Sequence, residues 1–447
     1  MTIKRRVMRA GAWTLAGFGL RQIIRFGSNL LMTRLLLPEM FGVMAVATMV
    51  MVGLAMFSDM GLRQNVIRSH RGEDPLFLDT VWVVQILRGG VLWLCAVIVA
   101  AGLAFANGLG LFRPESVYAV GNLPYVIAVV SASVVISGFE STKILQASRN
   151  LSLARLTQID IAAQVGGLAC MLAWVLVDRS IWALAAGGIA ASFFRTALSH
   201  YLLSGTSNRW RWDSSALKEI FGFGKWVFIS SILGFMLNNG DRILLGGLVS
   251  SGALGTYVIA YMIYQAVDQV ITKVIGDVVY PTLSEVVRER PKELKRYYYR
   301  FYTATATVCY LSAGFLFVSG ATVIGFLYDS RYEDAGWMLQ ILILTLIVSP
   351  MHIANHCLMA LGLPRLFSLL IAVQLVALFL FLPLGFRYGG LPGAVSGVVL
   401  SNFACLPLTL YFSNKHGFLD LKKELLLLPM IGIGMAIGYS FIRAIAG

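Results

Sequence analysis

The sequence has little charge. Only 13% of its 447 residues are Asp, Glu, Lys or Arg, about half the share usual in soluble domains, whereas 58% are hydrophobic and the mean hydropathy is +0.76. A soluble fold of this composition would expose far more apolar surface than water tolerates. A soluble globular domain is therefore excluded, and the chain is predicted to be an all-α integral membrane protein.

Cysteine is also scarce, and the usual catalytic signatures are missing. The five cysteines lie inside apolar stretches without close pairing, which argues against a disulfide framework and a zinc site: Cys95, Cys170, Cys309, Cys357 and Cys405. No glycine-rich phosphate loop with its lysine, no nucleophile elbow and no Cys/His cluster occurs. The sequence thus predicts neither an enzyme nor a bound metal or cofactor.

The net charge of +14 at pH 7 has to be explained in a membrane context. A basic excess in a membrane protein usually reports topology and anionic lipid headgroups, so nucleic-acid binding is not expected. Met1 to Arg9 is basic, but the stretch after it contains Arg21 and Arg25 and lacks a small-residue cleavage site. This stretch is predicted to remain as the first span.

Apolar runs bounded by charged or turn residues predict about thirteen membrane spans, each close to the roughly 20 residues that cross a bilayer. They cover residues 10–34, 41–62, 80–106, 116–138, 154–177, 181–203, 219–240, 252–275, 302–327, 337–361, 364–386, 390–412 and 425–442. With the N-terminus in the cytoplasm, the cytoplasmic loops collect most of the 36 Lys and Arg residues. This bias supports a multi-pass topology with a cytoplasmic N-terminus.

A weak internal duplication relates the two halves of the chain. Residues 41–47 (FGVMAVA) resemble 254–260 (LGTYVIA), and 145–147 (LQA) resemble 358–360 (LMA) at the same offset. A unit of six spans is even, so both copies would enter the membrane in the same direction. The two lobes are therefore predicted to be related by a pseudo-two-fold axis along the membrane normal, with a central cleft.

This duplication predicts a domain organisation in three parts. Residues 1–206 form an N-terminal six-helix lobe, 207–415 a C-terminal six-helix lobe, and 416–447 an additional C-terminal transmembrane helix.

Arg21 and Arg25 stand four residues apart in the first predicted span, so both guanidinium groups lie on one helical face. An ionisable residue in a span normally faces a cavity or a partner, and guanidinium groups bind phosphate oxygens bidentately. The pair is predicted to bind an anionic headgroup. The alternative is purely structural: snorkelling to the interface, or pairing with Asp59, Asp160 or Glu140.

Further cations lie in other spans, two of them in the N-terminal lobe and one in the C-terminal lobe. Arg88, with Gln85 nearby, falls in the third span, Arg195 in the sixth and Lys225 in the seventh. We predict that Arg88, Arg195 and Lys225 complete a cationic cleft and that Gln85 lines it, while the structural alternative remains equally open.

Two further groups of polar residues are candidates for other roles. Five acidic residues could bind a coupling proton or sodium ion: Asp59, Asp160, Asp241, Asp268 and Asp277. Most of them lie near span ends. Asp268 is favoured, because Gln265 and Gln269 lie beside it in the same span. His352, Asn355 and His356 share a helical face, but no third ligand accompanies the two histidines. They are predicted to line a polar cavity rather than to bind zinc.

Four stretches in combination resemble the oligosaccharide flippases of the multidrug/oligosaccharidyl-lipid/polysaccharide (MOP) superfamily. They are RLLLPEMFGVMAVA (34–47), FSDMGLRQNVIR (57–68), SRNLSLARLTQID (148–160) and DRILLGGLVSSGALGTYVIAY (241–261). The resemblance implies two six-helix lobes and alternating access in the bacterial inner membrane. It also implies that an undecaprenyl-pyrophosphate-linked oligosaccharide repeat unit is moved from the cytoplasmic to the periplasmic leaflet for surface polysaccharide biosynthesis. The partners expected from it are this lipid-linked substrate, membrane lipids, a polymerase and other polysaccharide assembly proteins.

The sequence leaves two alternatives from other function classes. A cation-coupled exporter of small molecules or drugs belongs to the same superfamily, but its commonly cationic substrates would favour an acidic or aromatic lining rather than arginines. A membrane enzyme such as a polymerase or acyltransferase should have long outer loops or a catalytic His with acidic partners, and neither is present in the sequence.

Overall fold

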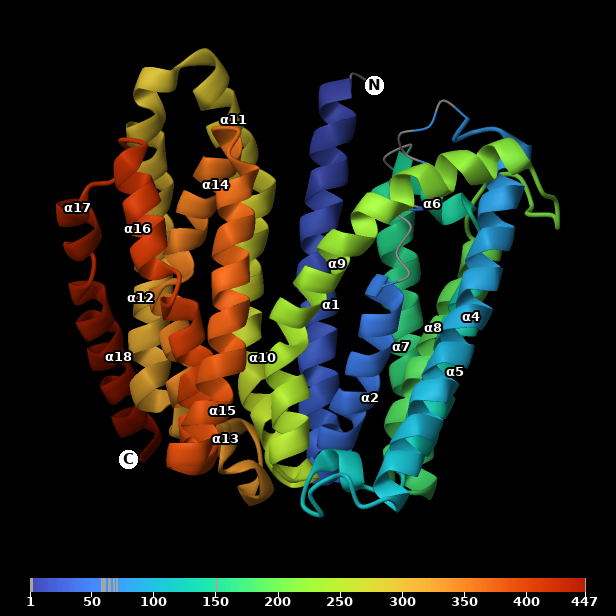
Figure 1. The fold of residues 1–447 in the computed structure, drawn as a ribbon, viewed down its shortest axis with the longest axis horizontal. Coiled ribbons are helices and arrows are strands. Elements are labelled where there is room, and N and C mark those ends of the chain that lie inside the picture. Colours follow the sequence, from blue (N-terminus) through green and yellow to red (C-terminus); the bar gives the residue numbers. More distant parts are fainter. Residues whose placement is uncertain are drawn as a thin grey trace. The chain divides into compact units, whose positions relative to one another are not determined.

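The computed structural model describes the backbone of residues 3–57, 62, 66, 69, 71–149 and 152–446. Side chains are described for the same residues except 3–16, 18, 57, 153, 218–231, 233 and 446. All regular secondary structure in this part of the chain is helical, as predicted (Figure 1). The resembling stretch 57–68 falls largely outside the described residues.

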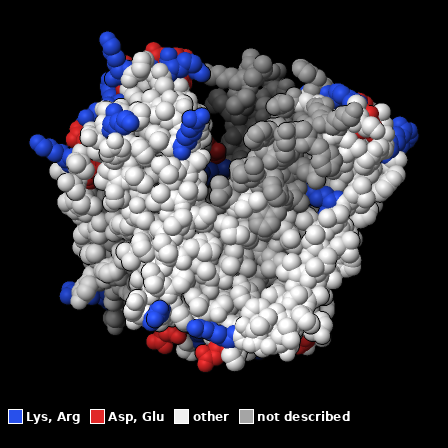
Figure 2. Space-filling view, viewed as in Figure 1, with Lys and Arg blue, Asp and Glu red and all other residues white. Residues whose placement is uncertain are grey.

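The described helices are long and apolar enough for a multi-pass membrane protein. Nine helical runs pass the requirements for a span, or ten when a bent pair after residue 122 is counted as one. The predicted first and seventh spans, whose side chains are only partly described, are not among them. Figure 2 shows that, on the face in view, Lys, Arg, Asp and Glu gather at the two ends of the helices and leave an almost uncharged band between them. Such a band is what lipid contact requires.

By compactness the chain divides into two units, residues 1–235 with 250–252 and residues 236–249 with 253–447. The predicted lobe boundary after residue 206 lies in the connection that follows the last complete helix of the first unit. The helices of that unit are α1 (Ile3–Leu35), α2 (Pro38–Phe57), α4 (Pro75–Gly108), η1 (Val117–Ala119), α5 (Leu123–Gly138), α6 (Lys143–Arg149), α7 (Leu153–Val177), α8 (Ile181–Tyr201) and the first part of α9 (Ser214–Leu248).

Small residues bring the helices of the first unit into close contact. Helix α7 packs against α8 and α1, and α5 packs against α4, α8 and α2. A Cβ atom on Gly167 would lie 2.7 Å from the carbonyl oxygen of Gly187, so only glycine lets α7 and α8 approach this closely. Helices α5 and α6 form the bent pair, with an angle of 67° between them. The backbone between them, residues 139–142, is therefore not helical.

The second unit contains the remaining helices. They are α10 (Ser251–Val274), η2 (Ile275–Val279), α11 (Tyr280–Glu289), η3 (Pro291–Glu293), α12 (Leu294–Leu327), η4 (Ser330–Tyr332), α13 (Ala335–Leu342), η5 (Ile343–Ile347), η6 (Ser349–Met351), α14 (His352–Ala360), α15 (Pro364–Phe403), α16 (Leu406–Lys415), α17 (Leu421–Leu425) and α18 (Pro429–Ala446). Element η2 is a π-helical segment that continues directly from α10 into α11.

Helix α15 contains two spans that meet at Gly390, where φ is +58°. Across this point a Cβ atom on Gly393 would lie 2.1 Å from the carbonyl oxygen of Gly385, and one on Gly397 would lie 2.4 Å from that of Phe381. These paired close approaches are antiparallel, so the chain reverses direction at the left-handed glycine. The reversal agrees with the predicted separate spans 364–386 and 390–412.

The C-terminal helix α18 packs along α12 within the second unit. A Cβ atom on Gly314 would lie 2.0 Å from the carbonyl oxygen of Ile431, and one on Gly434 would lie 2.3 Å from that of Leu311. Two glycines on opposite helices thus allow direct backbone contact, the packing mode that membrane helices favour.

Candidate functional site

Arg21 of α1 forms an ion pair with Asp160 of α7 through its Nη1 atom. The side-chain amide of Gln164, one turn further along α7, donates to the carbonyl oxygen of Arg21 over 3.3 Å. Thus α7 holds both the backbone and the guanidinium group of Arg21. The structural pairing that the sequence left open for this arginine is present, and its partner is Asp160.

Arg195 of α8 extends this pair into a cluster of four charges. Its Nε atom lies 2.7 Å from Oε1 of Glu140, and its Nη1 atom lies 3.5 Å from Oδ1 of Asp160. Asp160 therefore lies between two arginines. We call Arg21, Asp160, Arg195 and Glu140 the four-charge network; its members come from α1, α7, α8 and the break between α5 and α6.

The four-charge network is balanced and only half-buried. Two guanidinium groups face two carboxylates, and the exposed fractions of the side chains are 33% for Arg21, 23% for Asp160, 45% for Arg195 and 21% for Glu140. A lone charge in a membrane span costs at least about 2.5–3.5 kcal/mol on insertion scales, so mutual pairing is what makes these residues tolerable there. The exposed edges of both arginines remain accessible to a further anion.

Glu140 is placed by the unwinding after α5, which leaves carbonyl groups without helical partners. The side-chain amide of Gln85 on α4 donates to the carbonyl oxygens of Ser137, Gly138 and Glu140 at 3.1, 3.2 and 3.2 Å. Nε2 of His200 lies 2.9 Å from the carbonyl oxygen of Phe139. Gln85, predicted to line the cleft, thus satisfies the end of α5 and supports the backbone that carries Glu140.

The remaining predicted cations are Arg88, Arg25 and Lys225. Arg88 donates from Nη2 to the carbonyl oxygen of Ala55 over 2.8 Å, and so satisfies one of the last carbonyl groups of α2. The side chain of Arg25 is exposed on α1, one turn beyond Arg21. Lys225 lies on α9, and its side chain is outside the described residues.

In the second unit, Asp268 of α10 faces the break between α13 and α14, where Ser349 of η6 and His352 lie. Its carboxylate accepts a hydrogen bond from Oγ of Ser349 at 3.3 Å and another from the side chain of Thr272, and it interacts electrostatically with His352. A carboxylate held by two hydroxyl groups and an imidazole has the surroundings of a cation- or proton-binding group.

His352 also borders a cavity of about 140 Å³ within the second unit. Its polar lining consists of His352, Asn355, Gln374, Asn402 and Thr409. Gln374 donates to Oδ1 of Asn402 over 2.7 Å, whereas Oδ1 of Asn355 is buried and has no hydrogen-bond partner among the described residues. Two of the three residues predicted to line a polar cavity, His352 and Asn355, are therefore found on one.

The third residue of that prediction, His356, lies outside this cavity lining. Its ring is instead 5.6 Å from that of Tyr280 and 6.3 Å from that of Phe367, between centroids. Across the described part of the chain, no three His, Cys, Asp or Glu side chains are grouped so that they could hold a metal ion.

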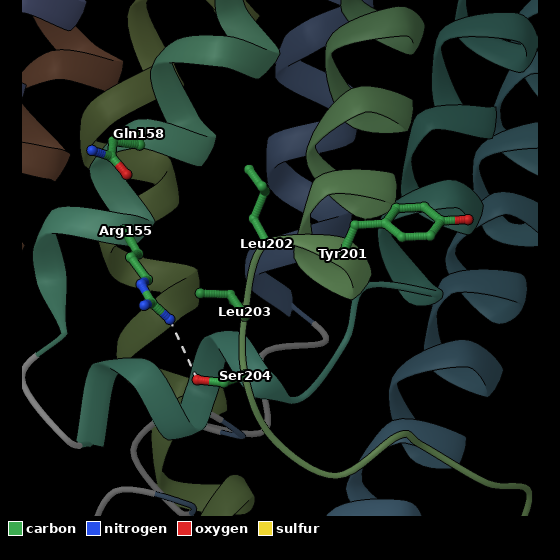
Figure 3. Close-up of a pocket in the computed structure, with 6 residues that line it drawn as sticks. All are labelled: Arg155, Gln158, Tyr201, Leu202, Leu203 and Ser204. Atoms are coloured by element: carbon green, nitrogen blue, oxygen red, sulfur yellow. Dashed lines mark hydrogen bonds between the residues drawn. The ribbon is translucent and has the colours of Figure 1, made fainter.

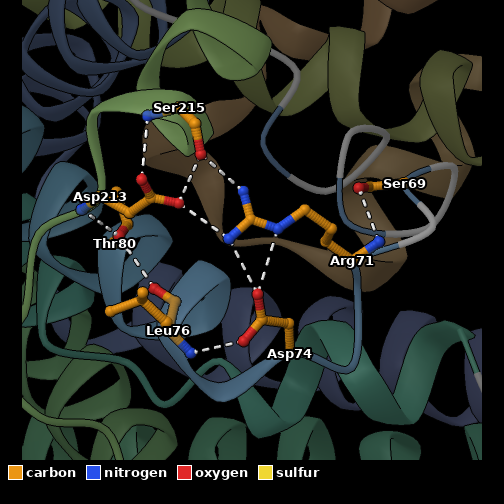
Figure 4. Close-up of polar contacts among 7 residues, drawn as sticks. All are labelled: Ser69, Arg71, Asp74, Leu76, Thr80, Asp213 and Ser215. Carbon is orange, nitrogen blue, oxygen red and sulfur yellow. Dashed lines mark hydrogen bonds and ion pairs between the residues drawn. The ribbon is translucent and has the colours of Figure 1, made fainter.

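A second polar cluster fixes the start of α9 to the start of α4 in the first unit (Figure 4). Nη2 of Arg71 lies 2.8 Å from both Asp74 and Asp213, and its Nη1 donates to Oγ of Ser215 over 2.8 Å. The Ser215 hydroxyl, followed by Arg71, holds the pKa of Asp213 well below its usual range, and Arg71 lowers the pKa of Asp74. This cluster of Arg71, Asp74, Asp213 and Ser215, the Arg71 clamp, was not predicted from the sequence.

The comparisons with known proteins agree with this fold. The family model described as "Polysaccharide biosynthesis protein" matches residues 31–336. A comparison with curated protein sequences finds no match. Solved structures of several membrane transporters are similar to the chain.

The lipid II flippase MurJ in an inward closed conformation gives a TM-score of 0.71 at 13% identity, over 97% of this chain and 93% of that one. An inward-facing multidrug resistance MATE family transporter of the MOP superfamily gives 0.67 at 15% identity, over 88% and 94%. A MOP superfamily transporter from Pyrococcus furiosus, described by the reverse polarity of its binding pocket, gives 0.53 at 16% identity, over 96% of both chains. At these identities the similarity shows the fold, which is that of the MOP superfamily, as the resemblance predicted.

Proposed function

Since the chain belongs to the family of polysaccharide biosynthesis proteins, we propose that it is a flippase for an undecaprenyl-pyrophosphate-linked oligosaccharide repeat unit. It carries this unit from the cytoplasmic to the periplasmic leaflet of the bacterial inner membrane by alternating access. Its N-terminus lies in the cytoplasm, and it works with a polymerase and other polysaccharide assembly proteins. The observation that supports this proposal best is the four-charge network.

In the network, carboxylates occupy the positions that phosphate oxygens would take. A guanidinium group presents a planar fork of donors that fits either anion, and charge-assisted contacts of this kind are the strong ones. In the empty carrier Asp160 and Glu140 neutralise Arg21 and Arg195. An arriving pyrophosphate, with more negative charge than one carboxylate, competes for the exposed edges of the same two arginines.

Because the pyrophosphate competes with carboxylates for the same arginines, the free energy of the protein changes little between binding and release of the substrate. If the arginines lacked acidic partners, the empty carrier would hold uncompensated charge in the membrane, and a bound pyrophosphate would leave slowly. Because the carboxylates stay beside the arginines, the ion pairs can form again when the headgroup leaves. The network therefore suits a transporter, which has to bind and then release its substrate.

The other predicted cations have supporting roles in this proposal. Arg25, exposed one turn from Arg21, adds positive charge for the headgroup, and Lys225 is assigned the same role from the sequence. Arg88 acts as a positioning residue, because it holds the end of α2 through the Ala55 carbonyl. Asp268 is the proposed site of the coupling proton or cation; its hydroxyl partners and the adjacent His352 support this role.

The test is a comparison of polymer export between the parent and the double variant Arg21→Gln/Arg195→Gln in cells that depend on this protein. We expect export to fall at least about tenfold, since two charge-assisted contacts are lost, and lipid-linked repeat units to accumulate. Arg179→Gln, an exposed arginine in the turn between α7 and α8, is the matched control and should export normally. Normal export by the double variant at equal protein abundance would overturn the proposed site.

The same cells distinguish the alternative, a cation-coupled exporter of small molecules. A flippase-deficient strain should accumulate lipid-linked repeat units without becoming sensitive to cationic drugs. Drug sensitivity without accumulation would replace the flippase proposal by the exporter.

A further inference from the structure

A cavity of about 410 Å³ lies between the beginning of α7 and the end of α8 (Figure 3), and no residue of the four-charge network lines it. It is lined by Arg155, Gln158, Tyr201, Leu202, Leu203 and Ser204. None of these residues is acidic. Nη1 of Arg155 lies 3.4 Å from Oγ of Ser204, a distance at the outer limit of a hydrogen bond. Within the described residues Arg155 has no ion pair, unlike Arg21 and Arg195.

A continuous exposed face of α7 leads away from this cavity. It repeats every three or four residues, as one side of a helix must, and after Gln158 it contains only apolar side chains: Gln158, Ala162, Val165, Ala169, Ala173 and Leu176. At 1.5 Å per residue the stretch from Gln158 to Leu176 is about 27 Å long, close to the thickness of a bilayer's hydrocarbon core. This face of α7 has the length and composition of a lipid-contacting surface.

The cavity therefore lies where a lipid's headgroup would be. The other sides of α7 pack against α1 and α8, so the apolar face is the side left for lipid. Tyr201, which is 86% exposed, lines the same cavity as Arg155, and tyrosine is enriched at the membrane–water boundary. Leu202 beside it is 51% exposed and adds apolar surface to the lining.

We propose that this cavity binds the phosphate group of an anionic glycerophospholipid, with one acyl chain along the apolar face of α7. Arg155 supplies the charge, and the Gln158 amide and the Ser204 hydroxyl supply neutral donors for the phosphate oxygens. By the predicted topology the lipid belongs to the cytoplasmic leaflet. The inference does not depend on the proposed flippase activity, because it concerns a resident membrane lipid and a different face of the first unit.

Binding here would also order the connection between the two six-helix sets. Ser204 stands at the start of the segment that leads from α8 to the Arg71 clamp at Asp213. A phosphate held by Arg155 and Ser204 ties the beginning of this segment to α7, while the clamp already ties its end to α4. An anionic lipid should therefore stabilise the full-length protein.

The experiment measures the association of spin-labelled phosphatidylglycerol with the full-length protein in phosphatidylcholine vesicles, relative to spin-labelled phosphatidylethanolamine. The parent should prefer phosphatidylglycerol. In Arg155→Gln this preference should be about fivefold lower. This factor corresponds to the free energy of about 1 kcal/mol that one basic residue contributes at an anionic surface. Arg155→Lys, which keeps the charge, should retain most of it.

The matched control is Arg209→Gln, an exposed arginine on the same connection but outside the cavity. Equal losses in Arg155→Gln and Arg209→Gln would reduce the effect to general surface charge and overturn the site. Gln158→Glu, which places a carboxylate beside Arg155 at an exposed position, should also abolish the preference even if Arg155→Gln fails to fold. Displacement of the phosphatidylglycerol by undecaprenyl phosphate at equal concentration would assign the cavity to the transported lipid and overturn the proposal.

Discussion

The ion pair between Arg21 and Asp160 should show strong energetic coupling in a double-mutant cycle. Arg21→Met leaves Asp160 with Arg195 at 3.5 Å, whereas Asp160→Leu leaves Arg21 without its carboxylate. Loss of one partner costs up to about 1 kcal/mol in an exposed pair and about 3–5 kcal/mol in a buried one. With side chains 33% and 23% exposed, we expect about 2 kcal/mol for Asp160→Leu and somewhat less for Arg21→Met.

The double variant should recover most of this loss, because two apolar side chains of similar size suit the membrane interior. Thermal unfolding of the purified protein in detergent measures the effect; about 2 kcal/mol corresponds to a midpoint about 4–8 °C lower for a unit of this size. Arg179→Met, in an exposed turn, is the control and should leave the midpoint unchanged. Midpoint changes that simply add up in the double variant would show that the two residues do not interact, and the described network would be wrong.

Two further predictions concern other parts of the chain. Because the folded-state pKa values of Asp213 and Asp74 are depressed, their stabilising effect is complete above the unfolded value of about 4 and is lost as the pH falls through the folded-state values. The temperature of the unfolding midpoint should therefore fall when the pH is lowered below about 4. This fall should be smaller in Asp213→Asn, and a fall of the same size in this variant would count against the Arg71 clamp. Gly393→Ala should lower stability by about 1–3 kcal/mol, since its Cβ would lie 2.1 Å from a backbone carbonyl oxygen, whereas Gly389→Ala has open space and should be neutral in the same unfolding assay.

The helical membrane architecture could be predicted because lipid contact leaves a direct trace in the sequence. Long apolar runs separated by basic or turn residues mark each span, and the reversal at Gly390 falls between two predicted spans. The irregularities inside spans could not be predicted. Examples are the 67° bend between α5 and α6, the π-helical Ile275–Val279 and the 3-10 segment Ile343–Ile347. The bend has a partner far away in the sequence, the Gln85 amide that satisfies the end of α5.

The candidate site could be predicted from the sequence only in part, because it too depends on contacts between distant segments. Arg21 and Arg195 were identifiable because charge in an apolar run is costly. Asp160 and Glu140 were named only as alternative partners beside Asp59. The sequence could not choose among them, because 139 residues separate Arg21 from Asp160 and a composition pattern carries no information on which helices are neighbours. Asp268 was favoured for the glutamines beside it, whereas its described side-chain partners are Ser349 and Thr272.

The central claim, that Arg21 and Arg195 receive a phosphate-bearing headgroup, is tested most directly by the binding of farnesyl pyrophosphate to the purified protein. We expect binding at least about tenfold tighter than that of farnesol, and loss of this difference in Arg21→Gln/Arg195→Gln but not in Arg179→Gln, because only the charged headgroup engages the two guanidinium groups. Equal affinity for the two ligands, or an unchanged preference in the double variant, would contradict the account.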